Sequence, residues 1–474
     1  MAPSPKSSKV FAEHVEDVEK DVIQEYPPEL EKNTVRLVDL RILPLLGLIF
    51  AVAVVDRINT GVARIAGMEK DLRLDVGNRY SIVACIYFIP YILLQLPSNI
   101  VLRKLGARTW ISICVMSWGA AQLGMGFVPS WGYLVLCRVL LGVFEAGLLP
   151  AIVFIISTWY KRHEVQKRMA SFYLSSIFIG GFSPIFGYAL TLLAPRRGLN
   201  GWQWIFIIEG AITILVGVVC YMFFPEFPDN NRFLSPEQTK LILDRVEQDR
   251  GDAMPDQMTW KKLRLHLSDW TTWAFGLMLM SATVPTYAIG FFVPIILSSM
   301  GYHVRDSLLL SAPPSLISVF FAFGFAYISD RTQRRALLLA IQTILTIIGL
   351  VVTAYATNHG ARYFGLCLTN IGASASVPGI LSYSANNVVS HTKRSVSTAV
   401  IVTFGGIAGV FATTVFRQKD YPRYLNGIWA ALGCQFLLLV LLAMTSFTFI
   451  RRNRLAREGK IGPLEGQPGF YYTI

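Results

Sequence analysis

Long apolar stretches separated by short polar loops dominate this sequence. A stretch of about 20 apolar residues is long enough to cross the hydrocarbon core of a bilayer as a helix. Twelve such runs occupy residues 41–66, 79–101, 109–128, 131–157, 168–193, 202–224, 271–298, 307–330, 336–356, 361–386, 395–416 and 426–449. The pattern therefore predicts an all-α membrane protein with twelve transmembrane helices, arranged as two six-helix bundles.

The twelve runs divide six and six around a polar segment. This segment contains Ser235-Pro236-Glu237-Gln238, which has the residues of a capping box and predicts a surface helix that reaches about Arg250. We therefore expect five parts along the chain. They are a cytoplasmic tail at 1–38, a bundle at 39–224, a cytoplasmic linker at 225–270, a bundle at 271–450 and a cytoplasmic tail at 451–474.

Basic turns recur at corresponding places in the two halves. Arg103 and Arg108 follow the second run, and Asp330, Arg331 and Arg335 follow the eighth. Parallel repeats of six helices are typical of transporters whose binding site lies between the halves.

Composition and charge placement narrow the class of protein. Only 15% of the residues are charged and 53% are apolar, whereas a soluble domain carries about 25% charged residues. The net charge of +13 comes from Lys and Arg that gather in the tails and in the loops of one side. That bias predicts cytoplasmic termini and a lipid bilayer, rather than nucleic acid, as the partner. The six cysteines lie inside the runs without CxxC spacing, so we expect neither disulfides nor a metal site.

Charged residues inside the apolar runs are the strongest functional signal. Asp56 and Arg57 lie in the first run, and Arg138 and Glu145 lie in the fourth. A charge at mid-bilayer costs about 3 kcal/mol or more, so such residues usually face a cavity and have a function. Helix rise places Asp56, Arg57 and Arg138 in the same half of the membrane, with Glu145 nearer the middle.

Helix geometry divides the roles of these residues. Neighbours on a helix point about 100° apart, so Asp56 and Arg57 face different ways. We expect Asp56 to form an ion pair or gate with Arg138, which leaves Arg57 to bind an anionic group bidentately. Glu145 has no opposite charge at its own depth, and burial favours the neutral form of a carboxyl group, so it is the candidate for proton coupling.

A purely structural role is the alternative for these buried charges. The charged residues of the first half would also serve as buried pairs that only fix helix packing. A packing role is the expectation for Glu209, a lone acid in the sixth run.

Polar residues without charge are further candidates for the substrate site. Tyr87, Tyr91, Tyr287 and Asn387 lie in or at the ends of apolar runs. Each would line a cavity or, alternatively, form an ordinary interhelical hydrogen bond. All six histidines lie in tails, loops or loop edges, so carboxyl groups must carry any coupled proton.

Several motifs together resemble a known transporter family. They are Asp56-Arg57-x-Asn59-x-Gly61-x-Ala63, Arg138-x3-Gly142-x2-Glu145-Ala146-Gly147, Trp159-Tyr160-Lys161-Arg162-x-Glu164-x3-Arg168, Gly201-Trp202-Gln203-Trp204-Ile205-Phe206-Ile207-Ile208-Glu209-Gly210 and Asn387-x5-Lys393-Arg394. This ordered set resembles the anion:cation symporter family of the major facilitator superfamily, closest to its fungal allantoate and nicotinate permease branch.

The resemblance implies alternating access between two bundles and proton-coupled transport of organic anions. It links Arg57 to the substrate, Glu145 and Asp56 to protons, and Arg138 to Asp56 as a partner. Gly405-Gly406 stands where the branch commonly has Gly-Asn, so the resemblance does not name the substrate.

We therefore predict symport of a small organic anion (a carboxylate vitamin, a ureide or an acidic metabolite) by a monomer in a fungal plasma membrane. The energy source is a proton gradient, with no cofactor. Export of a secondary metabolite or toxin is the first alternative, although Ser183-Pro184-Ile185 stands where exporters have Gly-Pro-Gly-Gly. A nutrient receptor that does not transport is the second. An enzyme is not expected, because no nucleophile–base pair, metal spacing or phosphate loop is present.

Overall fold

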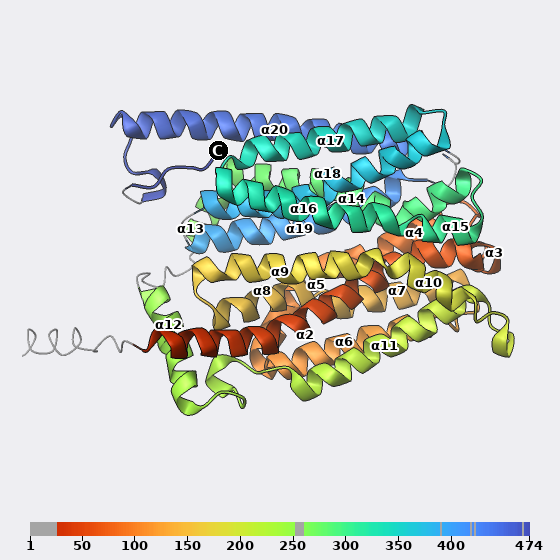
Figure 1. The fold of residues 1–474 in the computed structure, drawn as a ribbon, viewed down its shortest axis with the longest axis horizontal. Coiled ribbons are helices and arrows are strands. Elements are labelled where there is room, and N and C mark those ends of the chain that lie inside the picture. Colours follow the sequence, from red (N-terminus) through yellow and green to blue (C-terminus); the bar gives the residue numbers. More distant parts are fainter. Residues whose placement is uncertain (1–25, 252–259, 389–390, 418–419, 421–422, 467–468) are drawn as a thin grey trace, which may run out of the picture.

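The computed structural model describes residues 26–251, 260–388, 391–417, 420, 423–466 and 469–474. Long, roughly parallel helices form two layers, with the helices up to α11 in one layer and those from α14 onward in the other (Figure 1). The first half contains α2 (Pro28–Ala63), the π-helical turn η1 (Arg64–Met68), α3 (Glu69–Asp71), α4 (Arg79–Ile86), α5 (Phe88–Leu105), α6 (Ala107–Met125), α7 (Trp131–Glu145), α8 (Leu148–Trp159), α9 (Arg162–Gly181), α10 (Ser183–Thr191) and α11 (Gly201–Phe223).

The second half repeats this arrangement of long helices. It contains α14 (Trp270–Ser299), α15 (Val304–Leu309), α16 (Ala312–Thr332), α17 (Arg335–Tyr355), α18 (His359–Asn387), α19 (His391–Val415) and α20 (Leu425–Arg457). Within the described residues, ten helical segments are long and apolar enough to span a bilayer, and α4–α5 and α6 account for the two remaining predicted runs. The predicted twelve-helix membrane fold is confirmed.

Four of the twelve runs are each divided into two helices, and a proline follows every break. The runs break between α4 and α5, α7 and α8, α9 and α10, and α15 and α16. Each break lies about one turn before a proline: Pro90, Pro150, Pro184 or Pro313. Proline lacks an N–H group and its ring collides with the carbonyl four residues earlier, which weakens the helix at these places. Other helices of the protein, such as α14 with Pro285 and Pro294, continue through their prolines.

The segment between the halves carries two short helices, α12 (Pro236–Gly251) and α13 (Trp260–Leu267). The predicted capping box is confirmed: Ser235 N–H donates to Gln238 Oε1 at 3.0 Å, and Gln238 N–H donates to Ser235 Oγ at 3.2 Å. Arg245 of α12 binds Glu31 of α2 at 2.5 Å and also pairs with Glu164 of α9. These contacts attach α12 to the first half.

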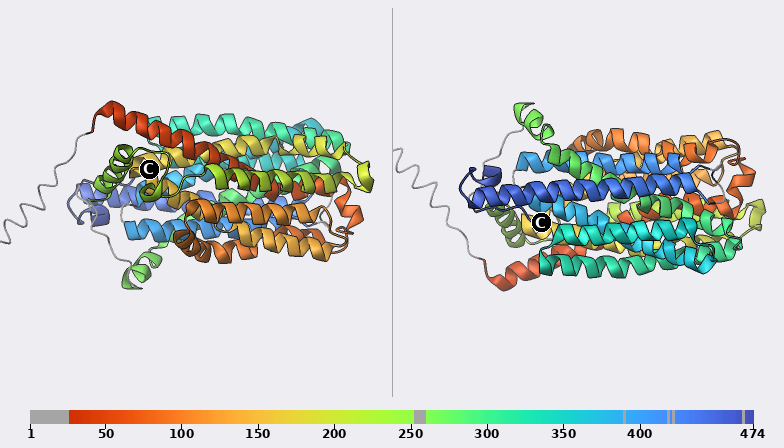
Figure 2. Two further views of the ribbon diagram at one scale, coloured as in Figure 1. Left: turned by 90° about the horizontal axis from the view of Figure 1, so that it is seen from below. Right: turned by 90° about the horizontal axis from the view of Figure 1, so that it is seen from above.

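Both short helices and the C-terminal residues lie at one end of the molecule, which we call the linker end; the opposite end is the far end (Figures 1 and 2). The two halves pack closely within the far half of the molecule. A Cβ atom at Gly61 of α2 would overlap the main-chain carbonyl of Phe291 in α14, and one at Gly409 of α19 would overlap the ring of Phe88. Glycine at these two positions permits the close approach of the halves.

Candidate functional site

Arg57 lies where the two halves meet. Its guanidinium group pairs with the carboxylate of Glu145 at the end of α7 and donates from Nη1 to Tyr287 Oη of α14 at 3.2 Å. Arg57 is 9% exposed and Glu145 is fully buried. One guanidinium therefore connects three helices and both halves of the molecule.

Aromatic rings surround this guanidinium. The centroids of the Tyr87 and Tyr91 rings lie 5.4 and 5.3 Å from Arg57 Cζ, within the range of cation–π attraction. These two rings stack on each other with centroids 5.5 Å apart, and the ring of Phe88 lies edge-on to Tyr287 at 5.2 Å. The structure therefore brings together Arg57 and the three tyrosines that the sequence nominated.

The pairing of Glu145 differs from the expectation. The sequence placed no opposite charge at its depth, but the structure gives it Arg57 as a direct partner. The depths predicted from helix rise compare backbone positions only, whereas the long side chain of Arg57 reaches Glu145 from a different depth. The interaction also satisfies much of the charge of Arg57, which was expected to be free.

Asp56 points away from Arg57, as helix geometry predicted, but it does not bind the expected partner. Its Oδ2 accepts from Trp118 Nε1 at 3.2 Å and from Thr213 Oγ1 at 2.8 Å. In the described part of the chain, no ion pair within 4.0 Å joins Asp56 to Arg138. The guanidinium of Arg138 instead donates to Asn59 Oδ1 at 3.5 Å, because Asn59 projects from the next turn of α2 toward it. The predicted direct pair is therefore wrong for this conformation.

Sequence reasoning missed the surroundings of Glu209. Asn59 Nδ2 donates to Glu209 Oε2 at 2.6 Å, so one amide connects this carboxyl group to Arg138. Glu209 is 3% exposed. Thr213, one turn along α11, reaches Asp56. We call Asp56, Asn59, Arg138 and Glu209 the polar cluster. The spacing Asp56-x2-Asn59 on one helix, with Glu209-x3-Thr213 on another, was the available signal.

Asn387 lies elsewhere, at the linker end of α18. Its Oδ1 accepts from the Thr473 N–H at 2.8 Å, and its Nδ2 donates to the Thr473 carbonyl at 3.2 Å. The amide is thus engaged by the C-terminal segment and is not brought to Arg57. The sequence could not show this because the two residues are far apart along the chain. A substrate contact of Asn387 therefore stays a prediction, and in this conformation its amide is occupied by Thr473.

The basic turns lie at the linker end, as their spacing in the sequence indicates. Arg108 Nε is 3.7 Å from Glu226 Oε1, which connects the start of α6 to the segment that follows α11. Arg335 is buried, whereas Arg331 is exposed. The side chains of Arg103 and Asp330 fall outside the described part of the structure.

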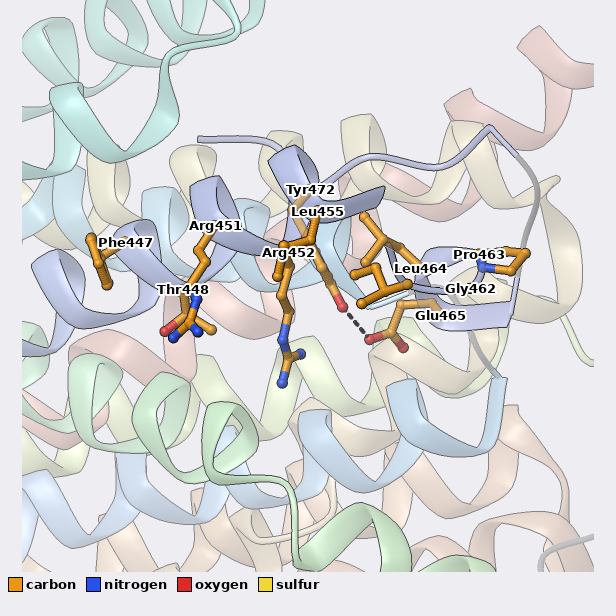
Figure 3. A pocket seen from close by; sticks show the side chains of 11 residues that line it. Phe447, Thr448, Arg451, Arg452, Leu455, Gly462, Pro463, Leu464, Glu465 and Tyr472 are labelled. Atoms are coloured by element: carbon orange, nitrogen blue, oxygen red, sulfur yellow. Dashed lines mark hydrogen bonds between the residues drawn. The ribbon is translucent and has the colours of Figure 1, made fainter. Parts of the chain in front are cut away.

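A cavity of about 600 Å³ lies near the C-terminal segment, away from Arg57 and the polar cluster. It is lined by the end of α20 and by residues 461–465 and Tyr472 (Figure 3). Tyr472 Oη donates to Glu465 Oε1 at 2.8 Å across one side of it (Figure 3). None of the residues nominated for transport lines this cavity.

Comparison with known proteins fits this architecture. Residues 46–413 match the family model of the Major Facilitator Superfamily. The chain belongs to this superfamily. The transporter prlL of Fungal sp. (strain NRRL 50135) is 29% identical over 474 residues, covering 97% of this chain and 95% of that protein. The high-affinity nicotinic acid transporter of Saccharomyces cerevisiae is 27% identical over 426 residues, covering 90% of this chain and 79% of that protein.

Solved structures show the same superfamily fold. An inward-facing, occupied bacterial homologue of the human lysosomal transporter Spinster has a TM-score of 0.67 at 17% identity, covering 86% of this chain and 97% of that one. The xylose transporter XylE of E. coli has a TM-score of 0.62 at 14% identity, covering 86% of this chain and 99% of that one. The prediction of a membrane transporter rather than an enzyme is confirmed by the family and its named transporters.

Proposed function

We propose that this superfamily transporter is a proton-coupled symporter of a small organic anion. The observation that carries the proposal is the position of Arg57, buried at the junction of the halves and bound by Glu145. A guanidinium group in such a place is suited to bind a carboxylate bidentately. The Glu145 carboxylate occupies the position that a substrate carboxylate would take.

Competition for Arg57 supplies a mechanism of coupling. While Glu145 is ionised, it holds the guanidinium and opposes the binding of another anion. Protonation of Glu145 weakens this ion pair and frees Arg57 for the substrate. Proton and anion therefore favour each other's binding by the same free energy, as thermodynamic linkage requires.

The surrounding rings suggest the shape of the substrate. Tyr87, Tyr91 and Tyr287 present ring faces and hydroxyl groups around Arg57. Flat faces beside a bidentate cation favour a small planar carboxylate over a large flexible one. A relative that is named as a nicotinic acid transporter supports this choice within the wider class of carboxylate vitamins, ureides and acidic metabolites.

We also propose the orientation and organisation of the carrier. The linker end, which carries the basic turns, faces the cytoplasm of a fungal cell, and the protein acts as a monomer in the plasma membrane. The bundles at 39–224 and 271–450 rock against each other, joined by the linker at 225–270, with cytoplasmic tails at 1–38 and 451–474. Close packing at Gly61 in the far half fits an inward-facing conformation.

Uptake of radiolabelled nicotinate by cells expressing the wild type and Glu145→Gln tests the proposal. Wild-type uptake should rise as external pH falls and should collapse when a protonophore is added. Glu145→Gln should exchange internal for external nicotinate but lose accumulation against a gradient, because it carries no exchangeable proton.

Glu458→Gln is the matched control, because it makes the same chemical change at an exposed ion pair with Lys460. Its uptake should equal that of the wild type. Proton coupling would be excluded if accumulation were independent of the pH gradient in the wild type and unchanged in Glu145→Gln. This result would have to hold for nicotinate and for other labelled carboxylates.

A further inference from the structure

Carboxyl groups outnumber guanidinium groups inside the first half. In the described part of this bundle, Asp56, Glu145 and Glu209 lie against Arg57 and Arg138, and each of the five is at most 9% exposed. Arg64, which is 2% exposed, is left out of this comparison because it already has its own carboxylate partner, Glu69, at 2.6 Å. If all five were ionised, the interior would carry one unbalanced negative charge. A buried unbalanced charge is strongly disfavoured, and a carboxyl group commonly takes up a proton instead.

The contacts show which carboxyl groups carry the unbalanced negative charge. Arg57 is engaged directly by Glu145, so Arg138 is left to balance both Asp56 and Glu209. Arg138 reaches Glu209 only through the amide of Asn59, with contacts of 3.5 and 2.6 Å. Asp56 is held by Trp118 and Thr213, which are neutral donors. Among the described residues, neither carboxyl group has an ion pair of its own.

Each of these two carboxyl groups also has one buried oxygen without a partner. Asp56 Oδ1 and Glu209 Oε1 make no hydrogen bond with the described residues, although both are shielded from solvent. An unpaired oxygen costs far more on an ionised carboxylate than on a carboxylic acid. Geometry and charge therefore both favour one neutral carboxyl group in this pair.

In the described residues, the elements packed around Glu209 supply no further cation that lacks its own carboxylate partner. α6 packs against α11 through uncharged residues, with Leu123 against Gly210. The turn η1 contributes Arg64, which is already paired with Glu69 at 2.6 Å. α10 approaches α11 through small residues, with Thr191 beside Gly201. From α2 come only Asp56 and the amide of Asn59.

We propose that Asp56 and Glu209 share one exchangeable proton and form a second proton-binding site beside Glu145. Asn59 and Thr213 are positioning residues that connect this site to Arg138 and Asp56. The inference rests on the proposed proton-coupled function and extends it to Glu209, which no resemblance assigns to protons. Loss of the shared proton leaves the interior negatively charged, and a negatively charged interior disfavours an anion at Arg57.

The proposal predicts how many protons are taken up when the anion binds, and this number can be measured by thermodynamic linkage. The slope of log Kd against pH gives the number of protons taken up with the ligand. We expect this slope for [³H]nicotinate on purified wild-type protein to approach two at alkaline pH, where both Glu145 and the shared site must be filled. At lower pH the shared site is already filled, and the slope should fall to one.

Three variants test the assignment. Glu209→Gln keeps an oxygen acceptor for Asn59 and removes one excess acid, so its alkaline slope should be one. Asp56→Asn should give the same value, because the pair holds a single proton. Glu145→Gln combined with Glu209→Gln should give zero. An alkaline slope that stays at two in both Glu209→Gln and Asp56→Asn overturns the proposal.

The outcomes separate this inference from the proposed function. A wild-type slope that never exceeds one, and that Glu145→Gln abolishes, overturns the shared site and leaves proton coupling intact. A wild-type slope of zero at every pH removes both.

A measurement without ligand covers the case in which nicotinate does not bind or Glu209→Gln does not fold. Infrared spectra of the ligand-free wild type should contain a protonated carboxyl band that disappears as pH rises. Asp56→Asn or Glu209→Gln should remove it. A wild type without such a band, or with a band that both variants retain, also overturns the proposal.

Discussion

The two halves of the transporter share an architecture but differ in what they bury. The interior of the first half holds ionisable groups on three helices, α2, α7 and α11. In the described part of the second half, buried charges such as Arg335 and Lys393 lie only at the linker end. The middle of that half contains hydroxyl and amide groups instead.

Many hydroxyl groups of the second half are satisfied within their own helices. Thr343, Thr346 and Thr353 of α17 each donate to the carbonyl four residues earlier. Thr369 and Ser376 of α18 do the same. Such bonds neither titrate nor need a partner on another helix. The contrast indicates that the first half carries the charge chemistry, whereas the second supplies a closely packed surface.

The largest expected effect comes from Arg57→Ala. This change removes the cation at the junction and leaves buried Glu145 without its partner, at a cost of about 3–5 kcal/mol. Nicotinate binding to purified protein should fall by at least about 100-fold, measured by scintillation proximity. Asp56→Asn should retain binding and mainly slow the transport cycle. Equal loss of binding in both variants would contradict the separate roles of these neighbours.

Arg335→Ala is the matched control in the second half, since it removes a buried arginine at the linker end. It should leave nicotinate affinity unchanged. A comparable loss of affinity would show that charge chemistry extends across both halves.

A smaller effect is expected from Gly372→Val in α18. A Cβ atom there would overlap the Gln342 carbonyl and Thr346 Oγ1 of α17, and overpacking of this kind costs about 1–3 kcal/mol. The melting temperature in detergent should fall by several degrees, with the pH dependence of binding unchanged. Gly433→Val in α20, where no atom lies within 4 Å of the added Cβ, should melt like the wild type. Equal melting of the two variants would contradict the close packing.

The smallest effect concerns Asp269, just before α14. Burial opposes its ionisation, but the hydrogen bond and the charge of Lys393 at 2.8 Å lower the pKa of this carboxyl group. A carboxyl group whose pKa is lower in the folded state stabilises that state above its unfolded pKa, near 3.9. This stabilisation is lost as pH falls through the folded pKa.

Asp269→Asn should therefore melt at a slightly lower temperature at neutral pH, by the equivalent of about 1 kcal/mol, and should lose less stability in acid. Its transport should keep the wild-type pH profile in the neutral range, since the pair is structural. The exposed Asp306, changed to Asn, is the control for both measurements. A shifted transport profile in Asp269→Asn alone would place coupling chemistry in the second half.

Hydrophobic periodicity and composition were sufficient to predict the transmembrane helices, because the thickness of the bilayer sets the length of each apolar run. They were also sufficient to place Asp56 and Arg57 on different faces of α2. Partners were harder to predict: Arg57 reaches Glu145 through side-chain length, and Asn59 binds Arg138 in place of Asp56. The contact of Asn387 with Thr473 was not predicted, because the two residues lie 86 positions apart in the chain. Contacts that depend on helix rotation and long-range docking leave no periodic signal in a sequence.

The proline breaks have a consequence for biosynthesis. α4, α10 and α15 contain only 8, 9 and 6 residues, whereas insertion into a bilayer as a helix requires about 20. None of them enters the membrane as an independent unit, so each must partition together with the helix that follows or precedes it. Backbone groups at the breaks are tolerated in lipid only when neighbouring helices shield them. The unpaired backbone groups at the breaks are therefore shielded from lipid only after the newly made helices have assembled around them.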